Sequence, residues 1–302
     1  MKKQTALIVL LVLALMQLNV GCNQGQRQEA TDLLHDTIGA EGLKMSEAMV
    51  NEIISSVPNP VEMASALQKN DVVYSQKLLN PSGNIDNYNT NFQRALNLGI
   101  YGTDLIYMNI YDRTVATLRY LTNIRELAAD LRLEQFFDYN TLNRLSESSK
   151  NVDSVLFITN TGFDKMTRYL IDQDRSNIAV LISAGTWIES LYIATHAPKT
   201  PENQELLNKR IGEQKKVLDN LILLMNAYEQ NEGFNTLLQD LKDLKSEFDR
   251  VTISYVYAEP SVKEQDGSLI VVDNSRSMVE INDETVKRIT EAVANIRNKI
   301  IE

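Results

Sequence analysis

The sequence predicts a mainly α-helical protein: a multi-helix bundle with a C-terminal β-hairpin and a final amphipathic helix. Two observations lead to this prediction. Apolar residues recur at steps of three and four through most of residues 43–250. At about residue 251 the pattern changes to the two-residue alternation of a strand, and helical spacing returns near residue 283. Helices joined by short links pack as bundles, so we expect residues 43–250 to form the bundle and 251–302 to pack on it.

The first 22 residues have the layout of an export signal. Lys2 and Lys3 precede an apolar run over about 6–18, and the segment ends at Cys22, the chain's sole cysteine. A bilayer-spanning helix needs ~20 apolar residues, so the run is too short to cross a membrane. The terminal cysteine makes the segment resemble a bacterial lipoprotein signal. That resemblance implies a signal peptide at 1–21, fatty acylation (palmitate) of Cys22, and a lipidated tether at 22–42.

The residues around Cys22 also indicate a location. Asn19 stands where the lipoprotein family usually has leucine, so an ordinary secreted protein with a free thiol is the alternative. By resemblance to lipoprotein sorting in Gram-negative bacteria, Asn23 after the cysteine favours the outer membrane. The following residues 24–28 contain no acidic cluster, which favours the periplasmic face.

Charge and cysteine content exclude some classes of partner. The chain has 40 acidic and 30 basic residues, for a net charge of −10. A negative chain is poorly suited to nucleic acid or to anionic lipid surfaces, so the expected membrane contact is through the lipid alone. With one cysteine the chain forms no internal disulfide, and its core must stabilise it.

Within the bundle, each helix follows from its apolar spacing and its flanking residues. Pro60 and the Thr200–Pro201 pair are expected to begin helices, and Asp174 or Ser176 to cap one. The helix at 175–196 is apolar nearly all round, which predicts a buried helix. The helices are expected at about 45–57 (with Met45, Met49, Ile53 and Val57 as its stripe), 61–70, 88–131, 134–148, 151–173, 175–196, 202–231 and 234–250.

The C-terminal part combines two β-rich runs with one helix. Residues 251–260 and 268–281 flank a turn containing Asp266 and Gly267, which predicts a hairpin. A two-stranded ribbon is marginal alone, so it should pack on the helices or join another edge. The last helix, at about 283–301, is expected to be capped by Asn282 or Asp283.

Residues 95–111 are the first candidate site. Gly99 and Gly102 lie inside a predicted helix, where each costs about 1 kcal/mol against alanine, and a closely crossing partner helix would offset that. Asp104 lies among apolar residues, with Tyr101 and Tyr107 nearby. A carboxylate with several phenols is consistent with a ligand pocket or with a tight helix crossing whose acid is satisfied internally.

Residues 182–196 are the second candidate, because they repeat this combination with Trp187, Glu189 and Tyr192. If the two helices face each other, Asp104 and Glu189 share one core. Paired carboxylates could serve acid–base chemistry or hold a metal. However, neither His35 nor His196 stands in a metal-ligand spacing, and the chain has no nucleophile motif or phosphate loop. We therefore expect no catalysis, no metal and no cofactor.

Several stretches together resemble a known group. They are PNPVEMASALQKN, YSQKLLNP, ALNLGIYGTDLIY and AGTWIESLYIAT, and they are similar to uncharacterised helical envelope lipoproteins of Gram-negative bacteria. The resemblance implies a location and a fold class, and no activity.

The function expected from the sequence is that of a lipid-anchored, periplasm-facing binding or scaffolding module. Its partner would be another envelope protein or a peptide, since a helical body offers grooves for such partners. The alternatives are an enzyme using Asp104 and Glu189 in a tyrosine-rich pocket, and a surface-exposed adhesion or nutrient-capture accessory.

Overall fold

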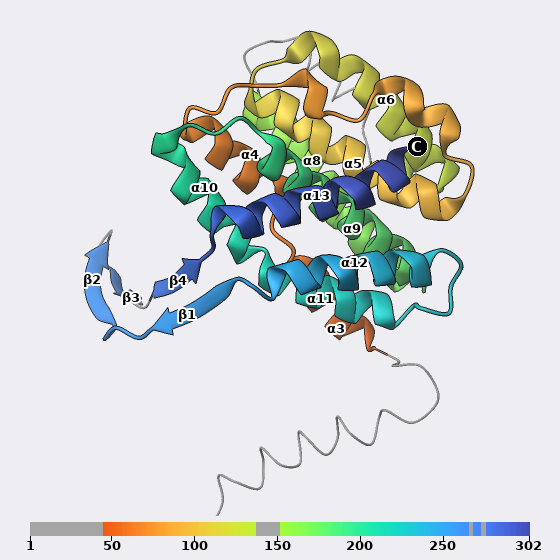
Figure 1. Ribbon diagram of the computed structural model, residues 1–302. Helices are drawn as coiled ribbons and strands as arrows, with labels where there is room; N and C mark the ends of the chain where they lie inside the picture. Colours follow the sequence, from red (N-terminus) through yellow and green to blue (C-terminus); the bar gives the residue numbers. More distant parts are fainter. Residues whose placement is uncertain (1–44, 137–151, 266–267, 273–275) are drawn as a thin grey trace, which may run out of the picture. The chain divides into compact units, whose positions relative to one another are not determined.

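The computed structural model describes residues 45–136, 152–265, 268–272 and 276–302. Residues 45–302 form one compact unit that is mainly helical, with short antiparallel strands near the C-terminus and a final helix (Figure 1). The predicted fold class is therefore confirmed. The leader, the tether, most of the helix expected at 134–148 and the Asp266–Gly267 turn lie outside the described residues.

Two buried helices form the centre of this unit, α5 (Asn91–Ile110) and α9 (Ser176–His196). α9 is the one helix in the described part of the chain that is long and apolar enough to cross a membrane. Its apolar window is 83% buried inside the unit, because α5, α8 and α13 pack around it. Its all-round apolar composition is thus that of a core helix.

Glycines allow α5 and α9 to cross closely. A Cβ on Gly99 would collide with the carbonyl oxygen of Ile182, and one on Gly185 with that of Leu96. Gly102 has a different neighbour: a Cβ there would lie 2.5 Å from the ring of Phe163 on α8. Gly99 therefore admits a helix backbone, whereas Gly102 admits an aromatic ring.

The other helices surround this pair, and α13 packs on α9, α12 and α5. Figure 1 shows α13 lying across the middle of the helical body, with α11 and α12 along one side. Their bounds are α3 Glu47–Ser55, α4 Pro60–Lys69, α6 Thr114–Asp130, α8 Val152–Asp172, α10 Pro201–Glu213, α11 Lys215–Asn226, α12 Phe234–Phe248 and α13 Asp283–Ile301, with a short 3-10 turn η3 at Glu134–Phe136.

The single helix predicted at 88–131 is wrong, because the chain turns at Asp112. That residue takes the left-handed conformation (φ 56°), and the N–H of Arg113 reaches back to the carbonyl of Met108 at 2.9 Å. This is a helix-ending motif that glycine usually supplies, and aspartate tolerates it better than most residues. Asp174 ends α8 in the same way (φ 54°), so it does not cap α9, contrary to expectation.

The helix predicted at 202–231 is also divided, at Gln214. Its side chain accepts a hydrogen bond from the indole N–H of Trp187 at 3.0 Å, which fixes the junction of α10 and α11 against α9. Other predicted ends are confirmed. Pro201 opens α10, and Asn282 caps α13 by accepting from the N–H of Thr285 at 2.8 Å.

The first helix buries a different face from the one predicted. Val50 and Ile54 are buried, whereas Met49 is 43% exposed. Met45, Ile53 and Val57 pack only partly on the core, so the helix is rotated by about one position relative to the expected stripe.

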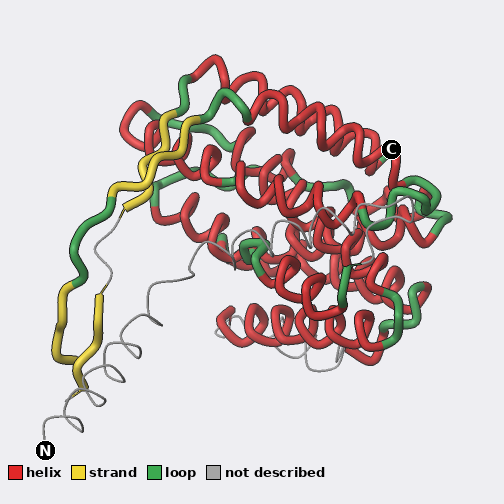
Figure 2. Tube along the Cα trace, turned by 90° about the horizontal axis from the view of Figure 1, so that it is seen from below, coloured by secondary structure: helices red, strands yellow, loops and turns green. Residues whose placement is uncertain are grey.

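The strands form one interrupted hairpin. β1 (Thr252–Val256) pairs with β4 (Arg276–Glu280), and β2 (Ser261–Gln265) with β3 (Ser268–Val272), both antiparallel. The end of the hairpin nearest the helices, which we call its root, packs on them, and Val251 and Val279 are buried there. Beyond the root the ribbon extends away from them (Figure 2). Its large exposed side chains are Tyr255, Val256, Tyr257, Val262 and Met278.

Gly99→Ala tests the close crossing. We expect it to lower the free energy of unfolding by about 1–3 kcal/mol, because neither helix backbone can move aside without strain. Urea unfolding of the full chain measures this. Gly83→Ala is the control, since nothing lies within 4 Å of a Cβ there. Equal stability of the two variants would contradict the packing argument.

Candidate functional site

Three charged side chains from distant parts of the chain meet inside the helical body. Asp104 on α5, Glu189 on α9 and Arg297 on α13 are all buried. The Nε and Nη2 groups of Arg297 donate to the two carboxylate oxygens of Glu189, each at 2.9 Å. Nη2 also donates to the carbonyl of Leu78 at 3.1 Å, and the guanidinium lies 4.3 Å from the ring centre of Tyr192. This two-pronged pairing fixes α13 to α9.

Asp104 is a second carboxyl group beside this single guanidinium. Its Oδ2 accepts the backbone N–H of Asn80 at 3.0 Å, while its Oδ1 accepts no hydrogen bond from the described residues. Burial raises the pKa of Asp104 well above its usual value, and so does the nearby Glu189; Arg297 and the Asn80 N–H oppose this. The raised pKa favours the protonated form of Asp104 beside the Glu189–Arg297 ion pair.

Tyrosine hydroxyls near the cluster bind the connection between α4 and α5, residues 71–90, which we call the strap. The strap contains only short 3-10 turns, η1 (Gln76–Leu78) and η2 (Ser82–Asn87), so its peptide groups need partners from elsewhere. Tyrosine side chains supply these partners. Three of them donate to strap carbonyls: Tyr111 to Val72 at 2.9 Å, Tyr120 to Asn80 at 2.8 Å and Tyr101 to Pro81 at 3.0 Å. The fourth, Tyr107, accepts from the N–H of Ser75 at 3.1 Å. Burial raises the pKa of all four phenols, so they remain neutral; three of them donate to the strap and Tyr107 accepts from it.

Amides from the strap and from α5 bind the end of α13. The carbonyls in the last turn of a helix have no partner within the helix. Asn97 donates to the carbonyl of Ile300 at 3.1 Å, and Asn84 to that of Ile301 at 3.2 Å. The C-terminal helix is thus held at its last turn as well as by Arg297.

The predicted site residues fall into four places. Asp104, Glu189 and Tyr192 meet around Arg297, and Tyr101 and Tyr107 bind the strap nearby. Gly99 lies at the helix crossing. Gly102 and Trp187 line two different cavities, of about 610 and 590 Å³ respectively. The eight residues therefore do not form one pocket.

The acid cluster lies outside the larger cavities of the described structure. The four of about 610, 600, 590 and 430 Å³ are lined by neither Asp104 nor Glu189. Each carboxyl group is already engaged by a protein group on at least one oxygen. Both carboxyl groups are fully buried, which is the geometry of a structural core.

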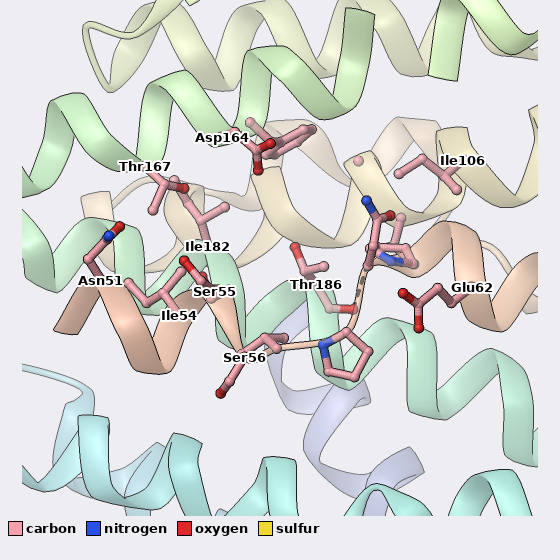
Figure 3. A pocket seen from close by; sticks show the side chains of 18 of the residues that line it. Asn51, Ile54, Ser55, Ser56, Glu62, Ile106, Asp164, Thr167, Ile182 and Thr186 are labelled. Atoms are coloured by element: carbon pink, nitrogen blue, oxygen red, sulfur yellow. Dashed lines mark hydrogen bonds between the residues drawn. The ribbon is translucent and has the colours of Figure 1, made fainter. Parts of the chain in front are cut away.

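The cavity of about 610 Å³ is the more open candidate, and we call it the α3–α8 cavity. The turn between α3 and α4 forms one wall, α8 the opposite wall, and α5 and α9 the floor. Figure 3 shows Asp164 and Thr167 on α8 across from Asn51 and Ser55 of α3, with Thr186 to the right of Ser55. The complete lining is Asn51, Ile54, Ser55, Ser56, Val57, Pro58, Asn59, Pro60, Glu62, Gly102, Thr103, Ile106, Phe163, Asp164, Thr167, Arg168, Ile182, Ser183 and Thr186.

Sequence reasoning missed the residues that complete the acid cluster and those that form the α3–α8 cavity. Arg297 follows Ile296 on the apolar stripe of α13, and a cation there is a signal for a buried acid partner. Asn80 contributes through its backbone, which no side-chain pattern reveals. The α3–α8 cavity joins residues more than 100 positions apart, and only Gly102 among its lining residues was a candidate.

Comparisons with known proteins add no identity. No protein-family model matches the chain, and searches of curated proteins and of solved structures found no match. The resemblance to helical envelope lipoproteins stays a prediction. Within the described residues, no group of three or more His, Cys, Asp or Glu side chains could hold a metal ion. The function must therefore be argued from geometry.

Asp104→Asn should change stability in a pH-dependent way. The folded pKa of Asp104 is raised above its unfolded value of about 3.9. Its contribution to stability is therefore fully present below about pH 4 and is lost as the pH rises through the folded pKa. Asparagine needs no proton and can donate to Glu189. We expect the free energy of unfolding of Asp104→Asn, relative to wild type, to increase from pH 4 to pH 9 in urea titrations.

The same titrations with Glu189→Gln provide the control. Asp104→Asn leaves unchanged the charged groups that face Asp104, chiefly Glu189 and Arg297, and the phenols of Tyr88 and Tyr120. Their own titration therefore cancels in the difference between this variant and wild type. Glu189→Gln leaves the buried Arg297 without its carboxylate, and we expect a loss of about 3–5 kcal/mol. A flat difference between Asp104→Asn and wild type across this pH range would show that Asp104 is ionised in the fold.

Proposed function

We propose that this chain is a lipid-anchored envelope protein whose helical body binds a ligand and catalyses no reaction. The anchor rests on the leader that ends at Cys22. Asn23 favours the outer membrane, and the lack of an acidic cluster at 24–28 favours its periplasmic face. A tether raises the effective concentration of a binding module near partners in the same membrane.

One observation carries binding over catalysis: the acid pair is sealed, whereas the accessible cavity lies elsewhere. Glu189 is bound on both oxygens by Arg297, and Asp104 is held by the backbone of Asn80. A general acid must be within hydrogen-bond reach of a substrate atom. The raised pKa of Asp104 would suit such an acid, but burial without an entrance explains it equally well, so it does not favour the enzyme alternative.

The α3–α8 cavity has the size and position expected of a ligand site. Its volume of about 610 Å³ is within the usual range for small-molecule sites. Its floor is the tight crossing of α5 and α9, where Thr103 Oγ1 donates to the carbonyls of Gly99 and Thr186. A floor fixed in this way reduces the entropy that binding must overcome.

Cys22→Ala tests the anchor. During growth with labelled palmitate we expect the label on the wild-type protein and none on the variant. In cell fractionation the wild type should sediment with the outer membrane, whereas the variant should be unprocessed or soluble. Asn23→Ala is the matched control and should retain the label. A variant that still carries label and fractionates like wild type would overturn the lipoprotein proposal.

A pair of tryptophan variants tests binding at the α3–α8 cavity. Ser55 and Glu52 are both exposed on α3, but only Ser55 lines this cavity. In a ligand-observed NMR fragment screen of the full chain, we expect hits that disappear with Ser55→Trp and persist with Glu52→Trp. The reason is that an indole at Ser55 fills the cavity mouth. An absence of hits that depend on Ser55 would remove the cavity from the proposal.

A further inference from the structure

We propose that the α3–α8 cavity binds a neutral saccharide. This inference rests on the proposed binding function and names its ligand class. The argument uses the lining side chains, their unused hydrogen-bonding capacity, the aromatic wall and the charge at the rim.

Eight of the nineteen lining residues carry a hydroxyl or amide side chain. Within the part of the chain that the structure describes, the side chains of Asn51, Ser55 and Ser183 form no hydrogen bond with protein groups. Hydroxyls and amides both donate and accept, so they suit a ligand that offers both functions on adjacent atoms. Sugar hydroxyls have this property, whereas an apolar ligand would leave these groups unpaired.

An aromatic ring completes one wall. Phe163 is half-buried and lies against Gly102, and any Cβ at that position would displace the ring. The glycine therefore lets the ring approach the floor of the cavity. The face of an aromatic ring is electronegative, and it favours the polarised C–H face of a pyranose. An aromatic side chain beside hydroxyl groups is a combination that suits the two sides of a sugar ring.

The rim charges disfavour anionic ligands. Asp164 and Glu62 are acidic and Arg168 is basic, so the lining has one more negative than positive group. Asp164 and Arg168 form no ion pair with each other among the described residues, which leaves both able to bind a ligand. A carboxylate is a strong acceptor for two adjacent hydroxyls, whereas a phosphate or a uronic acid would be repelled.

The backbone around the cavity argues against an extended peptide. Peptides are commonly bound through free N–H and C=O groups at a strand edge, or as an apolar helix in an apolar groove. Here helices supply most of the lining, and their peptide groups are engaged internally. The turn contributes Pro58 and Pro60, which have no N–H. A compact polar ligand fits better than either kind of peptide.

A printed panel of oligosaccharides tests the proposal. The panel carries neutral gluco-, galacto-, manno- and N-acetylglucosamine oligomers beside sulfated and uronic-acid oligomers. The probe is the full-length protein in a polyoxyethylene detergent, since maltoside detergents would compete. We expect binding to at least one neutral oligomer and none to the acidic ones, and calorimetry then gives the affinity for the strongest.

Two substitutions on α8 locate the binding. Asp164→Asn should weaken the affinity about tenfold, the loss expected for one hydrogen bond to a charged group. Asp172→Asn is the matched control, because Asp172 is exposed on the same helix and lies outside the lining. It should leave the affinity unchanged. Phe163→Ala should also weaken binding. Because it also removes the packing of the ring against Gly102, Asp164→Asn is the deciding variant.

The outcomes separate the ligand class from the general function. The saccharide proposal would be overturned by any of three results: no binding to any oligomer on the panel, a preference for acidic oligomers, or equal affinity of Asp164→Asn and wild type. If the fragment hits still depend on Ser55 in that case, the binding function stands with another ligand class. If those hits are also absent, both proposals fail.

Discussion

The ion pair between Glu189 and Arg297 is the interaction on which the rest of the structure depends. It joins the central helix α9 to the C-terminal helix α13, and through Leu78 it also holds the strap. Burying two charges costs several kcal/mol per ion unless their hydrogen bonds are satisfied. Here the guanidinium is paired on two nitrogens and lies over the ring of Tyr192. The pair therefore specifies the arrangement of three segments that lie far apart in the sequence.

The strap explains why the core contains so many tyrosines and asparagines. An irregular segment lying on buried helices needs partners for its peptide groups, since unpaired ones cost about 1–3 kcal/mol each. Phenol hydroxyls reach these groups from α5 and α6 while their rings pack in the core. The rings of Tyr101 and Tyr120, for example, pack against each other with their centres 5.6 Å apart. The tyrosine-rich composition that suggested a ligand pocket is thus accounted for by this supporting role.

The sequence predicted what depends on local spacing and missed what depends on distant partners. Helical periodicity, the proline starts and the Asn282 cap are local, and they were predicted correctly. The break at Asp112 was missed because aspartate took the left-handed position that glycine normally marks. Arg297 was missed because helical periodicity gives the face of a residue and not its partner 108 positions away. The cavity has no sequence signature, since its lining comes from five helices and a turn.

The sealed cluster and the open cavity are built on the same two helices. Thr103 and Asp104 are consecutive on α5, and Thr186 precedes Glu189 by less than one turn of α9. Asp104 and Glu189 contribute to the core, whereas Thr103 and Thr186 line the cavity floor. The close crossing at Gly99 restricts movement between α5 and α9, and the ion pair fixes α13 on α9. In the proposed function the buried cluster would contribute to binding indirectly, by supporting the floor against which a ligand would lie.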